Sequence, residues 1–241
     1  MKYLNMPEDG YVFIVTYGRS GSTLLQNLLN HIDGYCIRGE NNNTLAHIAR
    51  AWDAVDHSQV MRGLRKDGRT TGCGDPWYGG EHPVPKRYGQ QLANVFVREI
   101  LQPPPGTRVA GFKEIRFHRD PGFFPRYMTF LRRFFPRARF VFNTREHAAV
   151  MRSGWWAEWD PERVQEILTR AEGLYDQYLA RFPDTAIRLR YEDYTANPDG
   201  LRPLFDFLGE PWDRALVEHV LDRRLDHLKT PTDAEPPTQD G

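Results

Sequence analysis

Small residues link two apolar segments near the N-terminus. Residues 11–15 have the pattern of a buried strand, residues 24–32 carry leucines at helical spacing, and the link contains Gly18-Arg19-Ser20-Gly21-Ser22-Thr23. The first backbone N–H groups of such a helix have no partner inside it, and the helix dipole favours an anion there. The N–H groups of residues 20–23 would therefore bind a phosphate or sulfate group. An ordinary strand-to-helix turn is the alternative.

The sequence of this loop differs from the loop of nucleotide triphosphatases. Their loop needs Gly-x-x-x-x-Gly-Lys-Ser/Thr, whereas this chain has an arginine, Arg19, early in the loop and no lysine after Gly21. A P-loop kinase would also need carboxylates that hold Mg²⁺, and the sequence shows no evident set of them. The loop is therefore P-loop-like without being a Walker loop.

Cations and polar residues also follow other predicted strands. Lys113 and Arg116 follow one strand, and Arg145 follows the next, with Ser153 eight residues later on the helix that we expect there. Eight residues rise about 12 Å along a helix, a gap that an arginine side chain and one phosphate could close together. Arg-Tyr-Glu-Asp at 190–193 follows the last strand. The alternatives are an exposed arginine at a helix start, a serine that ends a helix and a lysine that faces solvent.

Strands and helices alternate along the chain. We expect strands over 11–15, 35–38, 109–113, 139–143 and 186–190, and helices over 24–32, 44–52, 88–101, 123–135 and 161–182. This order predicts an α/β fold: a single three-layer domain with a mostly parallel sheet flanked by helices, and ligands at the carboxyl ends of the strands. We assign residues 1–229 to this domain and residues 230–241 to a flexible tail. Residues 63–85 show no sustained period.

The composition limits the kinds of partner. The 241 residues include 32 Lys plus Arg and 32 Asp plus Glu, so overall charge gives no reason to expect a nucleic acid or a membrane as a partner. No segment approaches the ~18 apolar residues of a membrane span, and the N-terminus lacks a secretory leader. Two cysteines without a disulfide pattern fit a reducing compartment. We therefore expect a cytoplasmic protein of undetermined oligomeric state.

Together these segments resemble the sulfotransferases that use 3′-phosphoadenosine 5′-phosphosulfate (PAPS). The resemblance covers roughly residues 11–212 and is closer to the bacterial, protein-tyrosine and carbohydrate types than to the cytosolic small-molecule types. It implies transfer of a sulfuryl group from PAPS to a hydroxyl of a sugar, a phenol or another alcohol, with 3′,5′-ADP as the product. It also implies a nucleotide site made of Arg19, Ser20, Gly21, Ser22, Thr23 and Leu24 at the 5′-phosphosulfate, Arg145 and Ser153 at the 3′-phosphate, and Tyr191.

The resemblance also implies catalytic residues. Glu40 matches the position of the catalytic glutamate in protein-tyrosine sulfotransferases, so we predict it as the general base, with Glu114 and His118 as second choices. Arg19 and Lys113 are predicted to contact the bridging and sulfuryl oxygens. Because a sulfuryl group carries less negative charge than a phosphoryl group, these cations and the loop amides suffice and we expect no metal. A carboxylate that merely caps a loop is the alternative for Glu40.

The acceptor site and the lid over the nucleotide are less defined. Some aromatic residues could line an acceptor cleft, although such residues more often belong to the core: Trp77, Tyr78, Trp155, Trp156 and Trp159. Five arginines could attract an anionic acceptor, although we favour an exposed helix face: Arg126, Arg132, Arg133, Arg137 and Arg139. Lys229 is a candidate for the lid. For the function as a whole, the alternatives are a P-loop kinase and a non-catalytic nucleotide-binding module.

Overall fold

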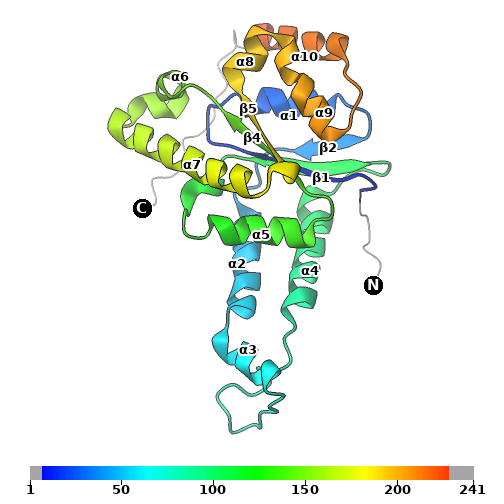
Figure 1. Ribbon diagram of the computed structural model, residues 1–241, viewed down its shortest axis with the longest axis vertical. Helices are drawn as coiled ribbons and strands as arrows, with labels where there is room; N and C mark the ends of the chain where they lie inside the picture. The colour runs from blue at the N-terminus through cyan, green and yellow to red at the C-terminus, as the bar shows by residue number, and fades with distance from the viewer. Residues whose placement is uncertain (1–6, 228–241) are drawn as a thin grey trace.

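The computed structural model describes residues 7–227 and has a five-stranded sheet at its centre (Figure 1). The strands are β1 (Gly10–Val15), β2 (Tyr35–Arg38), β3 (Val109–Glu114), β4 (Arg139–Thr144) and β5 (Ala186–Arg190). Their order across the sheet is β2-β3-β1-β4-β5, and every neighbouring pair is parallel. From β1, the chain builds β2 and β3 on one side and then β4 and β5 on the other. Ligands of such sheets bind where the direction changes, at the carboxyl end of the central strand.

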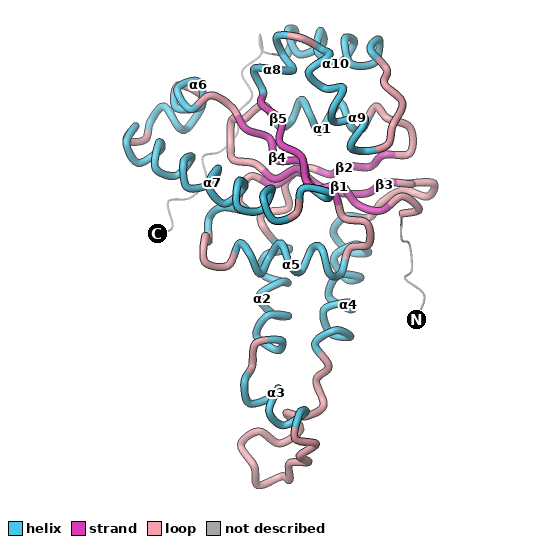
Figure 2. The backbone as a smooth tube through the Cα atoms, in the orientation of Figure 1, coloured by secondary structure: helices cyan, strands magenta, loops and turns pink. Residues whose placement is uncertain are grey.

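Helices cover both faces of the sheet. Within the described residues they are α1 (Ser22–Asn30), α2 (Thr44–Asp56), α3 (Gln59–Lys66), α4 (Pro85–Phe96), α5 (Phe124–Phe134), α6 (His147–Met151), α7 (Pro161–Arg181), α8 (Tyr191–Ala196), α9 (Arg202–Leu208) and α10 (Arg214–His227). The first face packs against α2, α4, α5 and α7, and the second against α1, α8, α9 and α10 (Figure 2).

Alternation along the central strand creates the two cores. Tyr11, Phe13 and Val15 of β1 belong to the core on the first face, whereas Val12 and Ile14 belong to the core on the second. All of these side chains are buried, as expected for a strand with neighbours on both sides and helices on both faces. The expected three-layer α/β domain with a parallel sheet is confirmed.

The chain between β2 and β3 projects from these layers. In Figure 1, α2 and α4 run away from the sheet, and α3 and the irregular residues 67–84 lie at the far end. We call residues 44–96 the arm and residues 59–88 the arm tip. The helix α3 was not predicted from the periodicity of the sequence. Its start is stabilised by Ser58, whose Oγ accepts a hydrogen bond from the backbone N–H of Met61 at 3.2 Å.

The expected element boundaries agree closely with the structure. Each strand is found within one residue of its expected ends, and the helix expected over 161–182 is α7. The helix expected over 88–101 consists of two parts: the α-helix α4 ends at Phe96, and a π-helical turn follows it over Val97–Leu101. The expected tail at 230–241 and the candidate lid residue Lys229 lie outside the described residues.

Candidate functional site

The loop between β1 and α1 has the backbone shape of an anion site. Arg19 (φ 65°) and Gly21 (φ 78°) both adopt left-handed conformations, and Gly21 precedes α1 without a side chain that caps the helix in the described structure. Alternating conformations of this kind turn successive N–H groups toward one side, and the helix dipole adds partial positive charge. The N–H of Leu24 is already used, since it donates to the carbonyl of Gly21 at 3.0 Å. Residues 20–23 are therefore the available donors.

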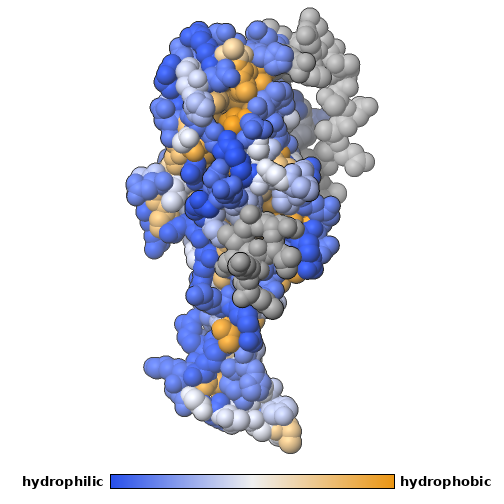
Figure 3. Space-filling view, turned by 90° about the vertical axis from the view of Figure 1, so that its right-hand side faces the viewer, coloured by the Kyte–Doolittle hydropathy of each residue, from blue (hydrophilic) through white to orange (hydrophobic). Residues whose placement is uncertain are grey.

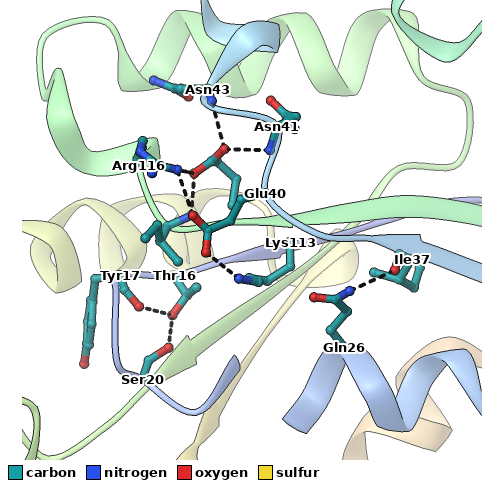
Figure 4. Close-up of polar contacts among 12 residues, drawn as sticks. Thr16, Tyr17, Ser20, Gln26, Ile37, Glu40, Asn41, Asn43, Lys113 and Arg116 are labelled. Carbon is teal, nitrogen blue, oxygen red and sulfur yellow. Dashed lines mark hydrogen bonds and ion pairs between the residues drawn. The ribbon is translucent and has the colours of Figure 1, made fainter. Parts of the chain in front are cut away.

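Buried hydrogen bonds fix this loop to the sheet. The hydroxyl of Thr16 lies 2.6 Å from Ser20 Oγ and 2.7 Å from the carbonyl oxygen of Asn143. The side chain of Asn143, at the end of β4, donates to the carbonyl of Ser20 at 2.9 Å. Ser20 is fully buried, so its hydroxyl, in contact with Thr16, holds the loop in place (Figure 4). The loop is preorganised by groups that sequence motifs did not single out.

Tryptophans support the other side of the loop. Trp156 Nε1 donates to the carbonyl of Gly18 at 3.0 Å, and a Cβ atom on Gly18 would lie 2.4 Å from the ring of Trp155. Trp156 is buried, and Trp155 and Trp159 pack against the core, so the core interpretation holds for these three. Trp77 and Tyr78 belong instead to the far end of the arm. The five aromatic residues therefore do not form a single acceptor cleft.

The structure brings the two predicted anion-binding segments together. Arg145 Nη1 donates to the carbonyl of Arg19 at 3.0 Å, and Arg19 Nε donates to Ser153 Oγ at 2.9 Å. The expectation that Ser153 lies on a helix is wrong, because α6 ends at Met151 and Ser153 follows it in a turn. That turn continues at Gly154 (φ 57°), where a Cβ atom would lie 3.0 Å from Arg19 Nε. Ser153 thus reaches Arg19 directly.

Tyr191 lies beside both segments. A Cβ atom on Gly21 would fall 2.1 Å from the Tyr191 ring, and the Arg145 guanidinium carbon lies 4.6 Å from the centroid of that ring. Tyr191 is buried as the first residue of α8, directly after β5. Its ring therefore packs against both the loop, at Gly21, and the guanidinium group of Arg145.

A cluster of charged residues follows β2 and β3. Glu40 accepts from Lys113 Nζ at 2.7 Å with one carboxylate oxygen and from Arg116 Nη1 at 2.8 Å with the other (Figure 4). Lys113 is only 6% exposed, so the alternative of a solvent-facing lysine is wrong. Burial acts to raise the pKa of Glu40, but Lys113 and Arg116 outweigh it and hold that pKa below its ordinary value. Glu40 is therefore ionised at neutral pH.

The two second-choice bases have different environments. Glu114 is fully buried and accepts hydrogen bonds from Arg116 and from the backbone N–H groups of Asn41, Asn43 and Ile115. One of its oxygens thus holds the segment that carries Glu40, through Asn41 and Asn43, and the other binds Ile115 and Arg116. His118 is buried, which, with the nearby charge of Arg119, lowers its pKa to about 4. It is a neutral imidazole at pH 7.

A hydrogen-bond network that the sequence did not reveal positions Arg145. The hydroxyl of Tyr17 accepts from the backbone N–H of Arg145 at 2.9 Å and donates to Glu172 on α7 at 2.7 Å. Glu172 also lies 3.1 Å from His147 Nε2. Tyr17 and Arg145 are far apart in the sequence, so no local pattern could indicate this contact.

The arginines considered for an anionic acceptor contribute to the fold. Arg126 forms ion pairs with Asp53 and Asp56 at 2.6 Å each. The others contact rings or backbone carbonyls: Arg132 lies over Phe182, Arg133 over Trp52, Arg137 donates to Glu8 and Arg139 donates to Leu208. Arg132 and Arg133 are exposed on α5, which agrees with the exposed helix face favoured from the sequence.

Two further findings concern metals and membranes. Residues 7–227 contain no group of three or more His, Cys, Asp or Glu side chains arranged to hold a metal ion. In the same part of the chain, no helix has both the length and the apolar character needed to span a bilayer.

Comparisons with known proteins agree with this fold. The chain is similar to the sulfotransferase domain of the olefin synthase of Synechococcus PCC 7002, with 19% identity, a TM-score of 0.56, and coverage of 89% of this chain and 78% of that chain. It is also similar to a sulfotransferase domain from the curacin biosynthetic pathway, with 17% identity, a TM-score of 0.52, and coverage of 86% and 76%. At these identities the likeness shows the fold alone.

Sequence comparison gives the family. No curated protein matches the chain significantly. The model of the family described as "Sulfotransferase family", however, matches residues 11–214, which include all of the sheet except Gly10 and every predicted site residue. The chain therefore belongs to the sulfotransferase family.

Proposed function

We propose that this chain transfers the sulfuryl group of PAPS to a hydroxyl group of an acceptor. The observation that carries the proposal is the contact between the two anion-binding segments, in which Arg145 and Ser153 both hydrogen-bond to Arg19. A nucleotide with anionic groups on its 3′ and 5′ sides needs two such sites close together. Arg145 Nε is buried without a partner among the described residues, which fits a side chain that binds a ligand with its remaining donors.

Residues of the loop and residues that follow β4 would bind different parts of the nucleotide. The N–H groups of residues 20–23 hold the 5′-phosphate at the start of α1, and the hydroxyl of Thr23, which is exposed, adds a hydrogen bond. Arg145 and Ser153 hold the 3′-phosphate, and Tyr191 packs beside them. Arg19 contacts the bridging or sulfuryl oxygens. PAPS, when bound, supplies the activated sulfuryl group.

Through its ion pair with Glu40, Lys113 would make the basicity of the Glu40 carboxylate depend on whether the donor is bound. While Lys113 donates to Glu40, the carboxylate is a weak base because its pKa is lowered. In the proposed reaction Lys113 turns away from Glu40 to contact a sulfuryl oxygen, and the pKa of Glu40 rises because the ammonium group is then farther from the carboxylate. Glu40 then accepts the proton of an acceptor hydroxyl on a sugar, a phenol or another alcohol, while Arg116 keeps it oriented.

A binding test followed by a transfer test checks this proposal. We expect 3′,5′-ADP to raise the melting temperature at concentrations at which ADP and ATP–Mg²⁺ have little effect. Radiolabelled PAPS should then transfer label to at least one class in a panel of sugars, phenols and aliphatic alcohols. Stabilisation by ATP–Mg²⁺ alone would indicate a kinase. Binding of 3′,5′-ADP without transfer to any acceptor or to water would indicate a non-catalytic module.

A further inference from the structure

Exposed large hydrophobic side chains are concentrated in one stretch of the described structure. Tyr78 is 65% exposed and Trp77 is 43% exposed, and both lie in the arm tip. The complete set lies between residues 60 and 100: Val60, Trp77, Tyr78, Val84, Tyr88, Val95 and Ile100. Isolated exposed hydrophobic residues are ordinary, but a group of them at the end of a projection indicates an interaction site.

The arm tip also carries an excess of positive charge. Six basic residues, Arg62, Arg65, Lys66, Arg69, Lys86 and Arg87, outnumber three acidic ones, Asp67, Asp75 and Glu81, although the whole chain has a formal net charge of zero. Two of the acidic residues are already engaged, Asp75 with Arg69 and Glu81 with Thr71. Lys66, Lys86 and Arg87 are exposed and have no ion-pair partner among residues 7–222, whose side chains the structure describes.

The shape of the arm tip is convex and loosely packed. A Cβ atom added at Gly68, Gly72 or Gly74 would meet no other atom within 4 Å. Figure 3 shows the arm as a narrow projection that is mostly blue with a few orange side chains, and whose end carries more pale atoms. A projecting end of this kind cannot enclose a small ligand, but it can enter a soft surface. A second copy of the same tip is a poor partner because its excess charge has the same sign.

This combination has the chemistry of an interfacial membrane anchor. Tryptophan and tyrosine accumulate where a bilayer meets water, because their rings are apolar and their edges are polar. Lysine and arginine beside them are attracted to anionic headgroups. We propose that the arm tip docks on an anionic lipid surface. Trp77 and Tyr78 enter the headgroup layer, and Lys66, Lys86 and Arg87 contact the anionic headgroups. The inference does not depend on the sulfuryl donor.

Vesicle co-sedimentation of the full chain tests this inference. We expect binding to phosphatidylcholine vesicles that contain about one third phosphatidylserine, little binding to pure phosphatidylcholine, and weaker binding as salt is added. The double variants Trp77→Ser/Tyr78→Ser and Lys86→Glu/Arg87→Glu should each bind at least about tenfold more weakly. Thermal melts identify any variant that fails to fold.

Matched controls use residues of the same kinds elsewhere. Val95→Ser/Ile100→Ser removes exposed hydrophobic side chains outside the arm tip, and Arg170→Glu/Arg181→Glu reverses two exposed charges on α7. Both should bind vesicles as the wild type does. Absence of wild-type binding at low salt, or tip variants that bind like the wild type, would overturn the inference. Binding to soluble poly-glutamate but not to vesicles would indicate an acidic protein partner and would also overturn it.

Discussion

Glu40 is the single residue whose surroundings constrain the proposed reaction most. Its two carboxylate oxygens accept from Lys113 and Arg116, and its pKa lies below the ordinary value although burial acts in the opposite direction. A base with a lowered pKa removes a proton slowly. In the proposed reaction, Lys113 therefore breaks its hydrogen bond to Glu40 and binds the donor before the acceptor reacts.

Replacing Glu40 by glutamine tests its role. The amide keeps the shape but cannot take a proton, so we expect Glu40→Gln to bind 3′,5′-ADP normally and to lose turnover by about a hundredfold or more. Glu210→Gln is the matched control, because Glu210 also accepts two hydrogen bonds from an arginine, Arg108, outside the proposed site. Near-normal turnover of Glu40→Gln, measured with labelled PAPS, would remove Glu40 from the role of base.

Because His118 is buried, we expect the free energy of unfolding to depend on pH. Burial lowers its pKa to about 4 from an ordinary value of 6.5, so the unfolded chain takes up a proton at higher pH than the folded chain does. Its stabilising contribution is complete above pH 6.5 and is lost as pH falls toward 4, by roughly 3 kcal/mol in total. In urea unfolding between pH 7 and 4.5, His118→Gln should lose less free energy of unfolding than the wild type. Parallel curves for the two proteins would contradict this.

At the scale of elements, the loop between β1 and α1 depends on one glycine. Gly21 combines a left-handed conformation with close contact to the ring of Tyr191. Gly21→Ala would add strain of about 1–3 kcal/mol and push the loop away from the ring, so we expect nucleotide affinity to fall at least about tenfold. Gly106→Ala is the control, since Gly106 is also left-handed (φ 85°) with no atom within 4 Å of an added Cβ.

Calorimetric titration with 3′,5′-ADP separates the two effects of Gly21→Ala, which are backbone strain and displacement of the loop from the Tyr191 ring. Gly106→Ala should lower the melting temperature through backbone strain and leave affinity unchanged. If Gly21→Ala binds as tightly as Gly106→Ala does, the packing of the loop against Tyr191 has no role in nucleotide binding.

The strands could be predicted from the sequence because their burial follows from local patterns. β1 is an apolar run, β4 has an apolar centre over residues 140–142, and the turn of small residues after β1 marks the start of α1. The position of Ser153 was not predictable in the same way. Its distance from Arg145 along the chain fits two turns of helix, but α6 ends early and a left-handed Gly154 turns the chain toward Arg19.

At the scale of the whole molecule, the sequence indicated the residues that we propose as anion ligands but not the contacts that hold them in place. Arg19 and Arg145 belong to recognisable motifs. The bonds that connect them to the sheet join residues more than a hundred positions apart, such as Thr16 with Asn143 and Tyr17 with Arg145. The arm could not be predicted either, since its projection depends on α2 and α4 leaving the sheet together. Contacts of this kind arise only from the complete fold.

The most direct test of the account compares two nucleotides that differ only in the 3′-phosphate. In calorimetric titrations, the wild type should bind 3′,5′-ADP at least about tenfold more tightly than 5′-AMP, because Arg145 gains a charge-assisted hydrogen bond to the additional phosphate. Arg145→Ala should remove most of that preference, with a smaller loss of 5′-AMP affinity because the hydrogen bond to the carbonyl of Arg19 is also lost. Arg181→Ala, which changes an exposed arginine at the end of α7, should alter neither affinity. No preference in the wild type, or an equal loss for both nucleotides in Arg145→Ala, would contradict the proposal that the two anion-binding segments bind one donor.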